Sequence, residues 1–156
     1  MTETQKKQAQ ITSLRLLAAS PKSHRELSRK LSEKGFDRQV VAETLADLEK
    51  KGLLSDTRYA QNLVTSLTQD KLSGRNRVVF ELKRHGIPQK VQDSILDSLD
   101  PKEEALRARE AGQSRWDRHK NLPSEKRKKR VYDFLVRKGF DFQLSRDTVE
   151  ALELIS

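Results

Sequence analysis

The most constraining feature of this sequence is an internal repeat in which a leucine is followed, four positions later, by a glycine. Three segments align on this pattern without a gap: residues 27–36, 78–87 and 131–140. The repeated glycines are Gly35, Gly86 and Gly139, so successive copies lie 51 and 53 residues apart. Self-similarity at a nearly fixed period is the signature of repeat architectures. The sequence therefore predicts tandem units rather than one domain arranged around a catalytic pocket.

The pattern within each repeat is helical. Apolar residues recur at helical spacing, and no run of β-branched or aromatic residues alternates with polar ones as in a strand. We expect an all-α fold of nine helices, three in each of three repeats at residues 1–52, 53–99 and 100–156. The expected capping residues are Ser23, Asp37, Ser55 or Asp56, Asp100 and Ser124, and the last helix is expected from Asp141 to about Leu154. The helix that follows residue 55 is expected to carry Tyr59, Leu63 and Leu67.

Composition narrows the class of protein. Only 34% of the 156 residues are hydrophobic and 35% are charged, which suits stacked helical units that each bury one stripe. The chain has no cysteine, and therefore neither a disulfide framework nor a thiolate. No apolar run approaches the roughly 18 residues that span a bilayer, and the first residues lack the apolar stretch of a secretion signal. We expect a cytoplasmic protein with no membrane partner.

The net charge of +9 is concentrated in two windows of the sequence. Residues 71–90 contain six Lys or Arg residues against one Glu, and residues 115–130 contain eight against two acidic residues. A single Lys or Arg on a helix surface is commonly only solvated, so the clusters carry more information than their members. Concentrated positive charge favours an anionic polymer or an acidic protein surface as partner.

Residues that could carry catalysis or bind a metal are scattered. His24, His85 and His119 show no metal-ligand spacing, and the chain has no Gly-rich loop of the GxxxxGK[ST] type that cradles phosphates. His85 directly precedes Gly86, where its partial positive charge suits the C-terminal end of a helix. We therefore expect no enzyme activity, no metal site and no cofactor.

One alternative is a winged helix-turn-helix that reads DNA sequence. Residues 23–31 and 36–51 have the spacing of its two helices, and the second would enter the major groove. Two features oppose this alternative. The residues after Leu54 indicate a capped helix where a β-hairpin wing is needed, and the second helix is rich in acidic residues, which phosphates would repel.

Three blocks of the sequence resemble the RecX family of regulators of the RecA recombinase. They are Glu26–Gly35 (ELSRKLSEKG), Gly52–Ala60 (GLLSDTRYA) and Gly74–Ile87 (GRNRVVFELKRHGI). The resemblance is strongest over residues 24–99 and weaker over 100–156. Ser55 departs from the acidic residue that usually precedes Asp56 in this family, although the capping logic is unaffected.

The resemblance implies an elongated, curved, solenoid-like molecule of three three-helix repeats. It also implies a monomer that lies along the filament of RecA on DNA and mostly inhibits ATP hydrolysis and strand exchange. Such a protein would take part in DNA recombination, DNA repair and the SOS response, and single- or double-stranded DNA is a further possible partner. The sequence-specific DNA-binding regulator stays the alternative.

The charge windows supply the candidate contacts to the filament or to DNA. The first predicted patch is Arg75, Arg77, Lys83 and Arg84. The second predicted patch is Arg115, Arg118, Lys126, Arg127, Lys128, Lys129 and Arg130.

Overall fold

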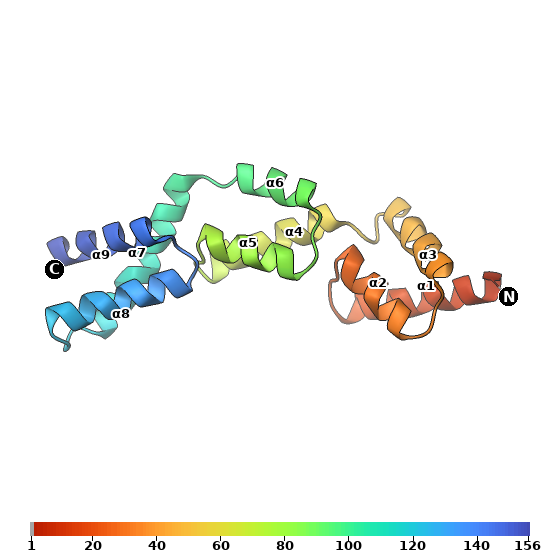
Figure 1. Ribbon diagram of the computed structural model, residues 1–156, viewed down its shortest axis with the longest axis horizontal. Helices are drawn as coiled ribbons and strands as arrows, with labels where there is room; N and C mark the ends of the chain where they lie inside the picture. Colours follow the sequence, from red (N-terminus) through yellow and green to blue (C-terminus); the bar gives the residue numbers. More distant parts are fainter. Residues whose placement is uncertain (1) are drawn as a thin grey trace. The chain divides into compact units, whose positions relative to one another are not determined.

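The computed structural model describes residues 2–156, and within that range it contains nine α-helices, one π-helical turn and no strand (Figure 1). The elements are α1 (Thr2–Ala19), α2 (His24–Glu33), α3 (Arg38–Lys50), α4 (Asp56–Thr65), η1 (Ser66–Asp70), α5 (Arg75–Arg84), α6 (Gln89–Asp97), α7 (Pro101–Arg118), α8 (Ser124–Arg137) and α9 (Phe142–Ile155). The all-α prediction is confirmed. Across residues 2–156, none of the helices is long and apolar enough to cross a membrane.

The chain divides into two compact units. Unit 1 comprises the residues up to Gln61 together with Leu82–Gln92, and unit 2 comprises Asn62–Glu81 together with Asp93–Ser156. The division passes through α4 and α5, so each unit contains part of the middle of the chain.

The sequence repeat has a common structural cause, which is the way that three helices end. Gly35, Gly86 and Gly139 have φ angles of +95°, +72° and +98°, in the left-handed region that glycine enters without steric cost. In each copy the N–H of the apolar residue after the glycine donates to the carbonyl of the repeated leucine, at 3.3, 3.0 and 3.1 Å respectively. This is the hydrogen bond of a Schellman motif. The repeat therefore encodes a helix stop with an apolar contact.

Helices α1, α2 and α3 pack against one another in unit 1. The predicted capping box starts α2: Ser23 Oγ accepts the Glu26 N–H at 3.2 Å, and Glu26 Oε1 accepts the Ser23 N–H at 3.0 Å. The stripe that α2 buries consists of Leu27 and Leu31. With these two, the core of unit 1 contains Val41, Leu45, Leu48 and Leu54.

Both candidates for the cap after Leu54 are used, but for different helices. Ser55 Oγ accepts the Arg58 N–H at 3.2 Å and so caps α4. Asp56 Oδ1 instead accepts the backbone N–H of His24 at 2.8 Å, at the start of α2. Asp56 therefore satisfies a free N–H of a helix that lies 32 residues earlier in the sequence.

Helices α7, α8 and α9 pack against one another in unit 2. Asp100 caps α7 as predicted. Asp141, which was expected as the first residue of the last helix, instead caps α9. The core of this unit is formed by Ala108, Ala111, Trp116, Val131, Leu135, Phe140, Val149 and Leu152.

Unit 2 also contains a backbone contact that requires two glycines. A Cβ on Gly74 would lie 2.5 Å from the carbonyl carbon of Gly139. The two segments are joined there by hydrogen bonds from Gly74 N to Lys138 O at 2.9 Å and from Asn76 N to Gly139 O at 3.0 Å. The start of α5 is therefore fastened to the end of α8.

Two local predictions are wrong. Ser124 does not cap α8, because Pro123 takes the capping position in an extended conformation and Ser124 Oγ donates to Glu153 Oε2 at 3.0 Å. The helix carrying Tyr59 and Leu63 ends at Thr65, and Leu67 lies in the wider turn η1. Leu67 is still buried, so the wider turn keeps its side chain in the interior while the path of the backbone changes.

The β-hairpin wing of the alternative fold is not formed in residues 2–156. The segment that would supply it is α4, which begins two residues after Leu54.

Candidate functional site

The first predicted patch is divided between the two units. Arg75 and Arg77 belong to unit 2, whereas Lys83 and Arg84 belong to unit 1. All four side chains are exposed. Their local surroundings differ, and this decides what each can contact.

Arg75 forms hydrogen bonds through its side chain and its backbone at the start of α5. Its Nη1 donates to the carbonyl of Leu96 at 3.0 Å, and its backbone N–H donates to Glu104 Oε2 at 2.6 Å. These hydrogen bonds hold the start of α5 to the segment around Leu96 and to α7. The guanidinium of Arg75 therefore already has a carbonyl partner within unit 2.

Arg77 lies in a crowded basic region of unit 2. Its Nε is 3.6 Å from Glu81 Oε1, and its backbone lies against Gly139. Lys138 donates a hydrogen bond to the carbonyl of Lys71. Burial, and then the nearby charges of Arg77, Lys71 and Arg115, lower the pKa of Lys138. Burial is the larger cause, and the neighbouring positive charges add to it.

Lys83 and Arg84 line a groove of about 620 Å³ in unit 1, together with residues of α2. We call this the α2–α5 groove. Its lining is Arg25, Glu26, Arg29, Lys83, Arg84 and His85. Four cations thus face a single carboxylate. Among residues 2–156, the side chains of Arg25 and Lys83 form neither an ion pair nor a hydrogen bond.

A glycine positions Arg25 in the α2–α5 groove. A Cβ on Gly86 would collide with the side chain of Arg25, lying 2.9 Å from its Cβ and closer still to its Cδ. The same glycine has φ +72° as it ends α5. Gly86 therefore serves both the helix stop and the close passage of Arg25 over the backbone.

His85 and Glu26 form the inner wall of this groove. His85 Nδ1 lies 3.0 Å from Glu26 Oε2 and 2.9 Å from the Tyr59 hydroxyl, and its Nε2 lies 3.4 Å from Arg84 Nη2. In the tautomer with the proton on Nδ1, His85 can form hydrogen bonds with both charged neighbours, because Nδ1–H donates to Glu26 and Nε2 accepts from Arg84. Partial burial tends to raise the pKa of Glu26, but the hydrogen bonds from the Ser23 N–H and from His85 outweigh it, and the pKa is lowered.

Two members of the second predicted patch cover aromatic rings. The Arg115 guanidinium lies 4.2 Å from the centre of the Phe134 ring, and that of Arg127 lies 3.9 Å from the Trp116 ring. Arg127 Nε also donates to the carbonyl of Trp116 at 2.9 Å. Cation–π contacts of this kind tie α8 to α7.

Two further members are paired with carboxylates. Lys128 Nζ lies 3.0 Å from Glu125 Oε1 and 3.3 Å from Glu153 Oε2, and Lys129 Nζ lies 3.1 Å from Asp133 Oδ2. The hydrogen bonds with Glu125 and Glu153 raise the pKa of Lys128. The five consecutive cations of α8 are therefore partly neutralised by nearby acids.

The remaining members are Arg118, Lys126 and Arg130. All three are exposed, and within the described part of the chain their side chains have neither ion-pair nor hydrogen-bond partners. Lys126 and Arg130 are one helical turn apart on α8, so they share one face. Arg118 is the last residue of α7, and the other two lie on α8. We name all three the α8 cations, after the helix that carries two of them.

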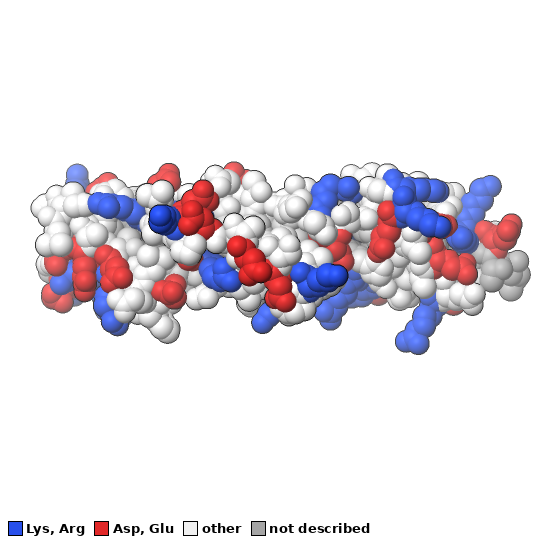
Figure 2. Space-filling model, turned by 90° about the horizontal axis from the view of Figure 1, so that it is seen from above, with Lys and Arg blue, Asp and Glu red and all other residues white. Residues whose placement is uncertain are grey.

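Charge counting along the sequence does not find Arg25 and Arg29. They lie on α2, more than 50 residues before Lys83, and only the fold brings them to one groove. Their spacing of four residues on a predicted helix was the available signal, since it places both on one face. On the face drawn in Figure 2, Lys and Arg side chains lie among Asp and Glu side chains rather than in one continuous area.

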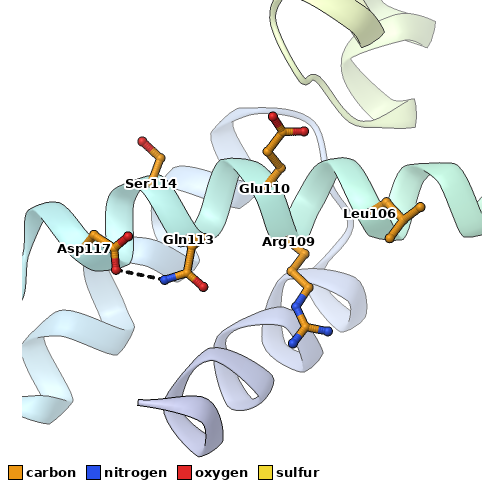
Figure 3. Close-up of a pocket in the computed structure, with 6 residues that line it drawn as sticks. All are labelled: Leu106, Arg109, Glu110, Gln113, Ser114 and Asp117. Carbon is orange, nitrogen blue, oxygen red and sulfur yellow. Dashed lines mark hydrogen bonds between the residues drawn. The ribbon is translucent and has the colours of Figure 1, made fainter.

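A second hollow lies along α7, but it brings no reactive groups together. Figure 3 shows that its lining residues Leu106, Arg109, Glu110, Gln113, Ser114 and Asp117 all project from this one helix. Gln113 donates to Asp117 at 2.8 Å, while Glu110 and Ser114 point away from Arg109. Across the described residues, no group of three or more His, Asp or Glu side chains could hold a metal ion.

Comparison with known proteins gives a consistent family. Three family models match in order: the first three-helix domain of RecX over residues 11–48, the second over 55–96 and the third over 103–149. These matches confirm the prediction of three tandem three-helix repeats.

Individual relatives match nearly the whole chain. Regulatory protein RecX of Chlorobaculum tepidum is 34% identical over 152 residues, covering 96% of this chain and 91% of the relative. Regulatory protein RecX of Mycobacterium sp. (strain JLS) is 34% identical over 147 residues, covering 91% and 80%. The crystal structure of RecX from Lactobacillus salivarius shares the fold, with a TM-score of 0.85 at 16% identity over 97% of this chain and 99% of that one.

Proposed function

Because this chain belongs to the RecX family of regulatory proteins, we propose that it binds the filament of RecA recombinase on DNA and mostly inhibits ATP hydrolysis and strand exchange there. In this proposal the protein acts by occupying a surface of the filament and needs no cofactor. It acts as a monomer in the cytoplasm, where the filament forms, and its repeats are residues 1–52, 53–99 and 100–156.

The observation that carries this proposal is the set of basic side chains left without partners. The α2–α5 groove contributes Arg25 and Lys83, and the α8 cations add Arg118, Lys126 and Arg130. Unpaired cations of this kind attract an anionic partner. They raise the rate of association with that partner and favour it over partners of other charge. Of the predicted contacts, Arg75, Arg77, Arg115, Arg127, Lys128 and Lys129 also support the local structure, so we assign them a smaller share of binding.

The decisive experiment measures DNA-dependent ATP hydrolysis by a RecA recombinase with increasing amounts of this protein. We expect suppression by the unaltered chain. Charge reversal in the groove (K83E with R84E) and of the α8 cations (R118E, K126E and R130E) should each weaken suppression by about tenfold or more, because each change replaces attraction by repulsion.

A matched control is the double variant K34E/R38E. Lys34 and Arg38 are exposed residues of unit 1 outside the groove, and the pair has the same charge change as K83E/R84E. The control should suppress ATP hydrolysis as the unaltered chain does. Equal suppression by all of the variants at physiological salt would reject the assignment of these surfaces, and no suppression by the unaltered chain would reject the function.

A further inference from the structure

The α2–α5 groove has more positive charge than its own residues neutralise. Both oxygens of Glu26, its one carboxylate, are occupied: Oε1 accepts from the Ser23 N–H at 3.0 Å and Oε2 lies 3.0 Å from His85 Nδ1. The carboxylate is therefore directed to the wall of the groove. Arg29 has only a long contact to Glu33, at 3.7 Å between strongly exposed side chains, which adds little stability.

The lining of the groove brings four cations together with one carboxylate. The side chain of Arg25 lies against Gly86, and Arg84 Nη2 lies 3.4 Å from His85 Nε2. Holding like charges in one concavity costs free energy, and a bound anion would relieve this cost.

We propose that the α2–α5 groove binds an oligophosphate, which is a chain of two or three phosphate groups such as a nucleoside di- or triphosphate carries. This goes beyond the proposed contact with the recombinase and does not depend on it. The guanidinium groups of Arg25, Arg29 and Arg84 match phosphate oxygens in two-pronged hydrogen bonds, and Lys83 adds a compact charge.

Size and charge favour this ligand over a carboxylate. A volume of about 620 Å³ falls in the range of small-molecule sites and far exceeds what one carboxylate fills. Arg25 and Lys83, which have no ion pair or hydrogen bond among residues 2–156, lie in this groove with Arg29 and Arg84, so several negative charges in a short span would suit it. Directly linked phosphates, as in a nucleoside di- or triphosphate, provide such a density, whereas the phosphates of a nucleic acid strand are separated by sugars.

Isothermal titration calorimetry of the full chain tests the proposal with three probes: sodium tripolyphosphate, ATP without magnesium, and a short single-stranded oligonucleotide. The groove variant is R25Q/K83Q. Its control is K34Q/R38Q, which removes one arginine and one lysine from exposed positions of the same unit outside the groove.

We expect tripolyphosphate to bind the unaltered chain and the control alike, and the groove variant about tenfold more weakly or worse, because charge-assisted hydrogen bonds are lost. Groove-dependent binding of ATP identifies a free nucleotide as the source. Groove-dependent binding of the oligonucleotide alone, with neither tripolyphosphate nor ATP bound, overturns the proposal in favour of a nucleic acid strand. Equal affinity of groove variant and control for every probe overturns the proposal.

A measurement on the unaltered chain removes any dependence on how the variant folds. On addition of tripolyphosphate, amide chemical shifts should change mainly in residues 24–29 and 83–86. Changes centred on α8 with none in these two segments would also overturn the proposal.

Discussion

Glu26 shows how one side chain can serve a helix and a site together. One oxygen closes the capping box of α2, and the other meets His85 after the end of α5. The cap was predictable, because Ser23 and Glu26 have the spacing of a capping box. The contact with His85 was not predictable from local sequence, since 59 residues separate the two.

The lowered pKa of Glu26 predicts a pH dependence of stability. Ionised Glu26 is favoured more in the folded chain than in the unfolded one, so it contributes stability above its ordinary pKa of 4.5. That contribution is lost as the pH falls through the lowered pKa. At neutral pH, E26Q should reduce the free energy of unfolding by about 1 kcal/mol, the scale of one hydrogen bond.

Urea denaturation at a series of pH values measures this effect. The difference between the unaltered chain and E26Q should be constant near neutral pH and shrink as the pH is lowered below about 4.5. A difference that stays constant into strong acid would show that the charge of Glu26 plays no part. Other carboxylates titrate in both proteins and cancel in the comparison.

At the scale of elements, the sequence was most informative where one short motif has one geometry. The Leu-x-x-x-Gly pattern predicted three helix ends, and all three adopt the same left-handed glycine and the same closing hydrogen bond. The prediction was wrong where neighbouring residues compete for one role. Pro123 displaced Ser124 from the cap of α8, and a wider turn replaced the last part of the helix that begins at Asp56.

The repeated glycines predict unequal effects of the same substitution. Gly35 and Gly139 have nearly equal φ angles, but a Cβ on Gly35 would have no atom within 4 Å, whereas on Gly139 it would lie 2.5 Å from the backbone nitrogen of Arg77. G35A should therefore cost only the left-handed conformation, about 1 kcal/mol. G139A should cost clearly more, by about 1–3 kcal/mol, because the start of α5 must move.

Chemical denaturation of the two variants provides the comparison, and G35A serves as the control for backbone conformation. Equal losses of stability would mean that α5 moves without cost and that the close contact of Gly139 with the backbone of Arg77 is not needed. A larger loss in G35A would contradict the packing described for unit 2.

At the scale of the whole molecule, the net charge of +9 favours an anionic partner. The fold determines which of the cations are exposed and available to contact such a partner. The two charge windows were visible in the sequence. Their members then separated into those that cover aromatic rings, those paired with acids and those left exposed. This separation depends on contacts between distant segments, and the gathering of Arg25 and Arg29 with Lys83 and Arg84 has the same origin.

The α8 cations predict a salt dependence. If Arg118, Lys126 and Arg130 contact phosphates of filament or DNA, the triple variant R118Q/K126Q/R130Q should flatten the plot of log affinity against log salt by roughly 2–3 units, near one per contact. Binding to recombinase–DNA filaments across a salt series measures the slope. The control K34Q/K50Q/K51Q removes three exposed cations of unit 1 and should change the slope little. Equal slopes for the two variants would count against these contacts.

The position of Glu26 has one more consequence. This carboxylate is the one acid in the lining of the groove that contains Arg25 and Lys83, and its Oε2 lies 3.0 Å from His85 Nδ1. A change that removes the imidazole, such as H85A, would free one carboxylate oxygen of Glu26. That carboxylate could then move toward the cations of the groove and compete with a bound anion. His85 would therefore control the occupancy of the groove without having to contact the bound anion.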